Sequence, residues 1–268
     1  MPLPPPDDVL IAFGASPPST RLATGQGTSW RVGQLVLKPL DMLVEALAWQ
    51  ERVLGDLDGR AAVRVAPPAR AVDGRLVVDG WTAWRLVAGS HRPGRWAEII
   101  RAGDQLHAAL RDEPRPGFLD RREDPWAAAD RVAWGERGLS VAAAVPHLDR
   151  LLAARRPVDD RAQLVHGDLT PNVLWEPGLP PAVIDLSPYW RPTAYAAAVV
   201  VADALVWEGA DERLFAAVDR VPRFGQHLVR ALVFRLATSH FAGTLGADQT
   251  DRYAYAVDLA CGLAAAGR

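Results

Sequence analysis

Two aspartates and an asparagine between residues 166 and 185 are the residue types of a metal-dependent phosphoryl-transfer site. The segment reads His-Gly-Asp-Leu-Thr-Pro-Asn-Val-Leu-Trp, then a turn rich in proline and glycine, then Ala-Val-Ile-Asp-Leu. Phosphoryl transfer requires magnesium held on the phosphates and a carboxylate that accepts the proton of the attacking hydroxyl. Asp168 is the candidate carboxylate, and Asn172 and Asp185 are the candidate metal ligands. His166 is a candidate for hydrogen bonding within the loop or for contacting the substrate.

Short apolar runs on either side of a turn would position these side chains. Residues 173–175 and 182–184 each predict a brief buried strand, and the Glu-Pro-Gly-Leu-Pro-Pro segment between them predicts a hairpin turn. Such a hairpin would bring Asn172 and Asp185 close together.

The cationic residues of the chain comprise one lysine, Lys38, and 29 arginines. A guanidinium is a wide planar fork and an ammonium is a compact point charge, so a composition dominated by arginine is expected to keep a lysine where arginine cannot replace it. Lys38 ends an apolar strand over residues 34–38, and the small-residue loop before it could bring backbone amides against phosphate oxygens. We therefore expect a phosphate-binding unit of loop, strand and lysine. The loop residues are Gly25, Gln26, Gly27, Thr28 and Ser29.

A helix is predicted after Pro39, over residues 42–57. Its acids Glu45 and Glu51 could reach back to the Lys38 ammonium and hold it in place. We favour Glu45 because it lies nearer to the end of the strand.

These motifs, in this order and spacing, resemble the aminoglycoside phosphotransferase and choline kinase superfamily, which has a protein-kinase-like fold. In that family a glycine-bearing hairpin precedes a strand lysine, a helix glutamate pairs with the lysine, and a His-Gly-Asp loop and a metal-binding Ile-Asp follow. The resemblance implies an α+β fold with two lobes. A small antiparallel-sheet lobe with one main helix is expected over residues 1–84, and a larger, mainly helical lobe over residues 85–268. ATP and Mg²⁺ are the implied cofactors.

The resemblance also implies where the adenine lies. Residues 81–89 are the expected crossover between the lobes, and in the family the backbone of this segment hydrogen-bonds the adenine edge. The implied residues are Thr82, Ala83 and Trp84. The segment Gly-Asp-Gln-Leu-His, ending at His107, resembles the family's early helix of the second lobe, where a histidine usually follows a leucine.

Three places depart from the family pattern. Three residues, where kinase loops have four, separate Asp168 from Asn172. No glycine closely follows Asp185, and Arg191 stands where the family tends to have an acid that braces the catalytic loop. Two other interpretations therefore stay open: a catalytically degenerate kinase fold that serves as a nucleotide-binding scaffold or regulator, and a nucleotidyl transferase on the same fold. Trp190, Arg191 and His240 are candidate substrate contacts.

Apolar periodicity gives the remaining elements. Strands are predicted at residues 32–38, 75–79 and 82–87. Helices are predicted at 95–110, 126–134, 141–156, 193–207, 212–218, 224–241 and 248–265, with prolines near several of the breaks.

Composition narrows the class of protein. The chain has 268 residues, 49% of them hydrophobic, which is enough for two lobes with their own cores. The net charge is −2 and no basic run alternates with aromatic residues, so nucleic acid is not an expected partner. The lone cysteine, Cys261, favours a cytoplasmic protein, and the longest apolar stretch, residues 194–207, is too short for a membrane span.

The expected acceptor is a hydroxyl of a small molecule. Aminoglycosides are polycations, and a site for them requires clustered acids in the helical lobe. Residues 203–268 contain acids and arginines in similar numbers, and only Asp211 and Glu212 are adjacent. A neutral or anionic metabolite, such as a sugar or a natural-product intermediate, is favoured, with a peptide serine or threonine as a variant. The oligomeric state is left open.

Overall fold

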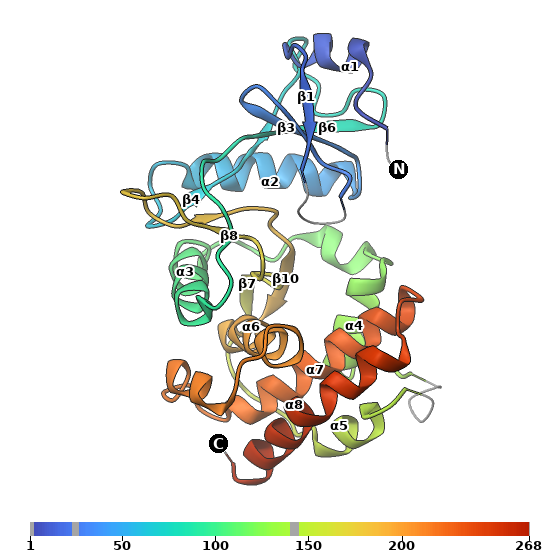
Figure 1. Ribbon diagram of the computed structural model, residues 1–268, viewed down its shortest axis with the longest axis vertical. Helices are drawn as coiled ribbons and strands as arrows, with labels where there is room; N and C mark the ends of the chain where they lie inside the picture. Colours follow the sequence, from blue (N-terminus) through green and yellow to red (C-terminus); the bar gives the residue numbers. More distant parts are fainter. Residues whose placement is uncertain (1–2, 23–26, 140–144, 268) are drawn as a thin grey trace. The chain divides into compact units, whose positions relative to one another are not determined.

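The computed structural model describes residues 3–22, 27–139 and 145–267, and the chain divides into two compact units (Figure 1). The first unit comprises residues 1–90 and 174–186, and the second comprises residues 91–173 and 187–268. A single boundary after residue 84 does not describe this division, because the chain returns to the first unit at Leu174. Both units mix helices and strands as the α+β class requires.

An antiparallel sheet of five strands, in the order β1-β2-β3-β6-β5, forms the first unit. The strands are β1 (Ser19–Arg21), β2 (Trp30–Val32), β3 (Leu35–Pro39), β5 (Pro68–Ala69) and β6 (Trp81–Arg85). The strand predicted over residues 32–38 is wrong at its start, because Gly33 turns the chain with φ +57° between β2 and β3. The strand predicted at residues 75–79 is also wrong, since only Val78 makes an isolated bridge there, to Trp81.

Two helices, α1 (Asp7–Ala12) and α2 (Val44–Leu57), accompany this sheet. Val9 and Leu10 of α1 pack with Val32 and Leu37 in one buried cluster. Successive side chains of a strand point to opposite faces, so the residue after Leu37, which is Lys38, points away from that cluster.

A small sheet, in the order β4-β9-β8, carries the predicted hairpin. Its strands are β4 (Arg64–Val65), β8 (Val173–Leu174) and β9 (Ala182–Val183). The strands β4 and β9 are parallel, with Arg64 opposite Ala182, and Leu179 N donates to Glu176 O in the turn between β8 and β9. The hairpin prediction for residues 173–184 is confirmed.

Helices make up most of the second unit, around a two-stranded antiparallel ribbon of β7 (Gln163–His166) and β10 (Pro188–Arg191). Pro188 lies opposite His166, so the end of β7 and the start of β10 meet. The helices are α3 (Trp96–Ala109), η1 (Gly117–Arg121), α4 (Pro125–Trp134), α5 (Leu148–Ala154), α6 (Thr193–Trp207), η3 (Glu212–Ala217), α7 (Phe224–Phe241) and α8 (Ala247–Ala265).

The core of the second unit is built on α6 and α7. Every residue of α6 from Tyr195 to Val206 is buried, and α7 packs against α4, α5, α6 and α8 (Figure 1). The predicted helices agree closely with α3, α4, α6, α7 and α8. The helix predicted at 141–156 corresponds only to α5, and its first residues lie outside the described ranges.

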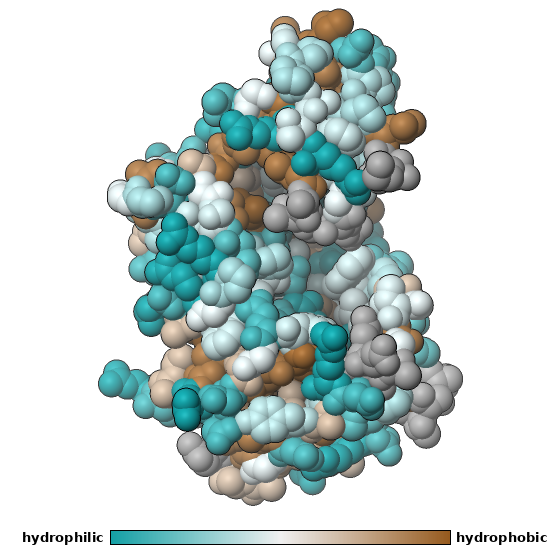
Figure 2. All heavy atoms as spheres, viewed as in Figure 1, coloured by the Kyte–Doolittle hydropathy of each residue, from teal (hydrophilic) through white to brown (hydrophobic). Residues whose placement is uncertain are grey.

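The surface mixes polar and apolar residues. Figure 2 shows hydrophobic residues in small groups among hydrophilic ones on the face in view. Across the described parts of the chain, no helix combines the length and the apolar character needed to cross a membrane.

Candidate active site

The chain's one lysine, Lys38, lies against two carboxylates of the first unit. Lys38 Nζ is 2.9 Å from Asp185 Oδ1 and 3.3 Å from Asp41 Oδ2, and it lies 5.1 Å from the centroid of the Trp84 ring. The lysine side chain is 10% exposed, whereas the two carboxylates are about half exposed. Burial alone would lower the pKa of Lys38, but the charges of Asp185 and Asp41 outweigh it and raise the pKa. The ammonium therefore stays charged.

The sheet fixes the backbone of this lysine. Lys38 pairs with Thr82 across β3 and β6, and the Thr82 hydroxyl donates to the Lys38 carbonyl at 3.1 Å. The Trp84 indole N–H donates to the same Thr82 oxygen at 3.2 Å. The strand pairing and these two side-chain bonds together limit the directions that Lys38 can take.

The acids that pair with Lys38 in the structure are Asp41 and Asp185, and the expectation that Glu45 holds the ammonium stays a prediction. The helix α2 begins at Val44, so Glu45 lies in its first turn and is exposed. Asp41, in the short segment between β3 and α2, is three residues from the lysine.

Asp185 follows β9 in a strained backbone conformation. Its φ is +52°, in the left-handed region that residues other than glycine seldom occupy. The next residue is anchored, because Gln50 Nε2 of α2 donates to the Leu186 carbonyl at 3.1 Å. Strain of this kind persists where the surroundings enforce it, and it gathers at functional sites.

The predicted phosphate loop falls between β1 and β2. Gly25 and Gln26 lie outside the described residues. Gly27 has φ +68°, and its carbonyl accepts from Arg21 Nε at 2.8 Å. Leu22 N donates to the carbonyl of Ser29 at 2.9 Å, so Thr28 and Ser29 lie in the connection that closes this hairpin.

The segment expected to bind adenine lies inside the sheet. Thr82, Ala83 and Trp84 belong to β6, with β3 on one side and β5 on the other. That this segment contacts adenine stays a prediction, and the chain leaves the sheet after it, over residues 86–90.

His166 organises the catalytic loop of the second unit. Its Nδ1 accepts from the backbone N–H groups of Asp168 at 3.2 Å and Ser187 at 3.4 Å, and Gly167 N donates to Ser187 O at 2.9 Å. The backbone N–H of His166 donates to His107 Nε2 at 3.0 Å. The His166 side chain is fully buried, which makes it a scaffold of the loop and corrects its candidacy as a substrate contact.

Gly167 permits a close approach between this loop and β10. A Cβ atom at this position would lie 2.6 Å from Cε2 of Tyr189, whose ring is itself buried. Only glycine fits against that ring without movement of the loop.

One carboxylate oxygen of Asp168 accepts a hydrogen bond from an arginine side chain. Its Oδ1 accepts from Arg235 Nη2 at 2.6 Å, and Arg235 is also paired with the buried Asp203. Asn172 closes the short loop, because its Nδ2 donates to the Asp168 carbonyl at 2.7 Å and its backbone N–H donates to Leu169 O at 2.7 Å. With Nδ2 engaged, the Asn172 side chain retains its Oδ1 as a possible metal ligand.

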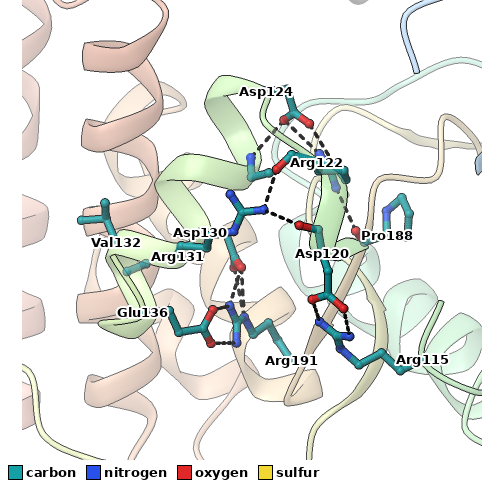
Figure 3. A network of polar contacts seen from close by, with 12 residues as sticks. Arg115, Asp120, Arg122, Asp124, Asp130, Arg131, Val132, Glu136, Pro188 and Arg191 are labelled. Atoms are coloured by element: carbon teal, nitrogen blue, oxygen red, sulfur yellow. Dashed lines mark hydrogen bonds and ion pairs between the residues drawn. The ribbon is translucent and has the colours of Figure 1, made fainter. Parts of the chain in front are cut away.

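Arg191 makes structural ion pairs and also lines the cavity beside Trp190, and its candidacy as a substrate contact stays a prediction. Its guanidinium bonds to Asp130 and Glu136 at 2.6 Å each, as Figure 3 shows, and its side chain is 14% exposed. In the same network Arg122 bonds to Asp124 and donates to the Pro188 carbonyl at 3.0 Å.

These arginines tie both ends of β10 to the α4 region, so they provide a brace where the family tends to use an acid. Trp190 lines a cavity of about 230 Å³ beside this network, and His240 lies in the last turn of α7.

Residues that sequence reasoning missed complete the site. Asp41 contacts Lys38, and Gln50 contacts the segment after Asp185. No sequence periodicity predicts either residue. Asp203 carried a readable signal, because a lone acid in a fully apolar helix requires a partner. Arg235 could not be matched to it from the sequence, since 32 residues separate the two.

The donor set suits a magnesium nucleotide. Magnesium is usually bound by one or two carboxylates together with substrate phosphates, and it does not require a cage of protein ligands. The described residues contain no group of three or more His, Cys, Asp or Glu side chains that could hold a metal ion by themselves. The half-exposed carboxylate of Asp185 is the best-placed ligand of the first unit.

The sheet with its lysine–aspartate pair and the helical unit with its His-Gly-Asp loop define a kinase-like phosphotransferase. The model of the phosphotransferase enzyme family matches residues 36–189, and the chain belongs to that family. The resemblance drawn from the motifs is confirmed. A comparison with curated proteins finds no significant match.

Solved structures share the fold over nearly the whole chain. The microcompartment-associated aminopropanol kinase has a TM-score of 0.64 at 18% identity, with 96% of this chain and 94% of that chain covered. Amicoumacin kinase hAmiN, in complex with AMP-PNP, Ca²⁺ and Ami, has a TM-score of 0.63 at 14% identity, with 95% and 91% covered. An aminoglycoside phosphotransferase from Alicyclobacillus acidocaldarius has a TM-score of 0.61 at 16% identity, with 99% and 96% covered.

Proposed function

We propose that this phosphotransferase moves the γ-phosphate of ATP to a hydroxyl of a small molecule, with Mg²⁺. The observation that carries the proposal is the 2.9 Å contact between Lys38 and Asp185, which joins residues 147 positions apart. It pairs the chain's one lysine with the strand-end carboxylate that follows the His-Gly-Asp segment. A lysine for the phosphates and an aspartate for the metal are the two groups that phosphoryl transfer requires on the nucleotide side.

Each residue then has a defined role. Lys38 would bind the α and β phosphates, with Asp41 and Asp185 holding its ammonium in place. Asp185 would ligate magnesium, and Asn172 would assist through its amide oxygen. When bound, magnesium supplies charge neutralisation for the phosphates.

Asp168 would orient the acceptor hydroxyl and take its proton. One of its oxygens is engaged by Arg235, and a carboxylate has a second oxygen that can accept a hydrogen bond from the acceptor. General-base positioning of this kind is worth ~10² to 10⁴ in rate, or ~3 to 5 kcal/mol of the barrier.

Calorimetry of Mg·ATP binding tests the nucleotide site. The Lys38→Ala variant is expected to lose about tenfold to hundredfold in affinity, because a hydrogen bond to a charged group contributes about 1.5–3 kcal/mol. The Arg52→Ala variant is the control, since Arg52 is an exposed cation of the same unit that lies 3.9 Å from Asp56. Equal affinities in the parent and Lys38→Ala, or binding that does not depend on the metal, would favour the scaffold interpretation instead.

A panel of acceptors, screened by ADP release, tests the substrate class. We propose a neutral or anionic acceptor, on the balance of acids and arginines in the helical unit. Because a similar fold occurs in an aminopropanol kinase, 1-amino-2-propanol and 1,2-propanediol form a matched pair. The neutral diol should be phosphorylated at least as well as the amine. A strong preference for the amine would overturn the proposed class.

Transfer of radioactive label from ATP to the product distinguishes a phosphotransferase from a nucleotidyl transferase. Label from the γ position is expected in the product. Label from the α position would identify a nucleotidyl transferase.

A further inference from the structure

A buried ion pair crosses the apolar core of the second unit. Arg235 of α7 donates from Nε to Asp203 Oδ1 at 2.7 Å and from Nη2 to Asp203 Oδ2 at 2.6 Å. The side chains are 10% and 5% exposed. Asp203 lies in the middle of α6, where every residue from Tyr195 to Val206 is buried. Two charges have therefore been placed where apolar side chains would fill the space.

Both members of the pair are charged near neutral pH. Burial raises the pKa of Asp203 to about 6, which leaves it ionised at pH 7 and above. Burial alone would lower the pKa of Arg235, but the charges of Asp203 and Asp168 outweigh it and raise the pKa well above its ordinary value.

Stability does not account for such a pair. Replacing a buried ion pair by well-packed apolar residues is often neutral or stabilising, because removing two charges from water is costly. An apolar pair could join α6 to α7, but it could not reach a carboxylate outside the core with a hydrogen bond. Arg235 makes that third contact, from Nη2 to Asp168 Oδ1 at 2.6 Å.

Aromatic rings hold the guanidinium in place. Its central carbon is 5.2 Å from the Phe234 ring centroid and 5.9 Å from that of Trp207. The Phe234 ring packs edge-on against Tyr189, the ring on which Gly167 rests. Arg235 and the backbone before Asp168 are thus fixed by one set of contacts.

We propose that Arg235 is a positioning residue that holds Asp168 in its reactive orientation, with Asp203 as its buried anchor. The inference rests on the proposed function of Asp168. The guanidinium occupies Oδ1 and selects one rotamer, so that Oδ2 is the oxygen turned to the acceptor. A positioned base loses little freedom when the acceptor binds, whereas displacement of a reacting group by about 1 Å can reduce the rate ~10²-fold.

Paired variants separate this role from a purely structural one. The double variant Asp203→Leu with Arg235→Met removes both charges and keeps the apolar contact between the helices. Arg230→Met is the matched control, because Arg230 is a buried arginine of the same helix that donates to the carbonyls of Gln226 and Arg156. Turnover is measured as ADP release with the best acceptor of the panel, or with water where no acceptor reacts. Thermal unfolding and Mg·ATP affinity are measured on the same samples.

The double variant should unfold near the parent temperature and bind Mg·ATP as the parent does, but its turnover should fall at least about tenfold. The single variant Arg235→Lys should lose less turnover than the double variant, because an ammonium can still contact Asp168. The Arg230→Met control should keep parental turnover. Parental turnover in the double variant would overturn the proposal.

A readout that needs no activity keeps the inference separate from the proposed function. Hydrogen exchange of the peptide spanning residues 164–174 should be faster in the double variant than in the parent or in Arg230→Met. If the parent shows no turnover with any acceptor, the proposed function fails, and the exchange experiment alone decides the role of Arg235. Unchanged exchange in that peptide would then overturn the inference.

Discussion

The acid stability of the fold should depend on one buried histidine. His107 is 2% exposed, and its Nε2 accepts the backbone N–H of His166 at the start of the catalytic loop. Burial, with a smaller effect from the neighbouring His166, lowers the pKa of His107 from 6.5 to about 3. The histidine therefore stays neutral in the folded protein at pH values where it is protonated in the unfolded chain.

The sign and size of the effect follow from proton linkage. Below pH 6.5 the unfolded state binds a proton that the folded state does not, so stability is fully present above that pH and falls as the pH decreases toward 3. At pH 5 the pH lies about 1.5 units below 6.5, the pKa of the histidine in the unfolded chain. Each unit is worth about 1.36 kcal/mol, so the free energy of unfolding falls by ~2 kcal/mol.

Urea unfolding at pH 7.5 and pH 5.0 measures this loss. A His107→Gln variant is the comparison, because the glutamine oxygen can accept the same N–H and does not titrate. The parent should lose ~2 kcal/mol more than the variant between the two pH values. Burial also lowers the pKa of His227, and its contribution is common to both proteins. Equal losses in the parent and the variant would refute the reasoning.

Two further predictions concern packing and helix capping. Gly225→Ala should destabilise the fold by ~1–3 kcal/mol through overpacking, because its Cβ would lie 2.5 Å from Ala264 N on α8. Gly262 lies in α8, and a Cβ atom there would meet no atom within 4 Å, so Gly262→Ala should instead stabilise the fold by ~0.5–1 kcal/mol. Equal shifts of the two variants in urea unfolding would contradict the close approach of α7 and α8. Asp124→Ala should cost ~0.5–2 kcal/mol in the same assay, because Asp124 caps α4 by accepting from Ala127 N at 2.9 Å; an unchanged midpoint would show that the cap is dispensable.

Local patterns were sufficient for the long helices. The helix α6 begins and ends at the predicted residues, Thr193 and Trp207, because Pro192 stops the preceding strand and an unbroken apolar run follows. The hairpin before Asp185 was equally readable, since its turn is dense in proline and glycine. These signals lie within a few residues of the elements that they specify.

Contacts between segments far apart in the chain were harder to predict from the sequence. The lysine was found from composition, but its partner Asp41 was not, because an acid in a short connection has no periodicity to mark it. The apolar pattern of β6 does not show that β3 and β5 lie on its two sides. Arg235 and Asp203 meet only because α6 and α7 pack together, which is a tertiary fact.

The central claim is that Asp168 accepts the proton of the acceptor hydroxyl during phosphoryl transfer. Asp168→Asn keeps the shape of the side chain and removes its basicity, so turnover measured as ADP release should fall ~10² to 10⁴-fold. Calorimetry on the same variant should show parental Mg·ATP affinity. Turnover at the parent rate with a verified acceptor would contradict the account.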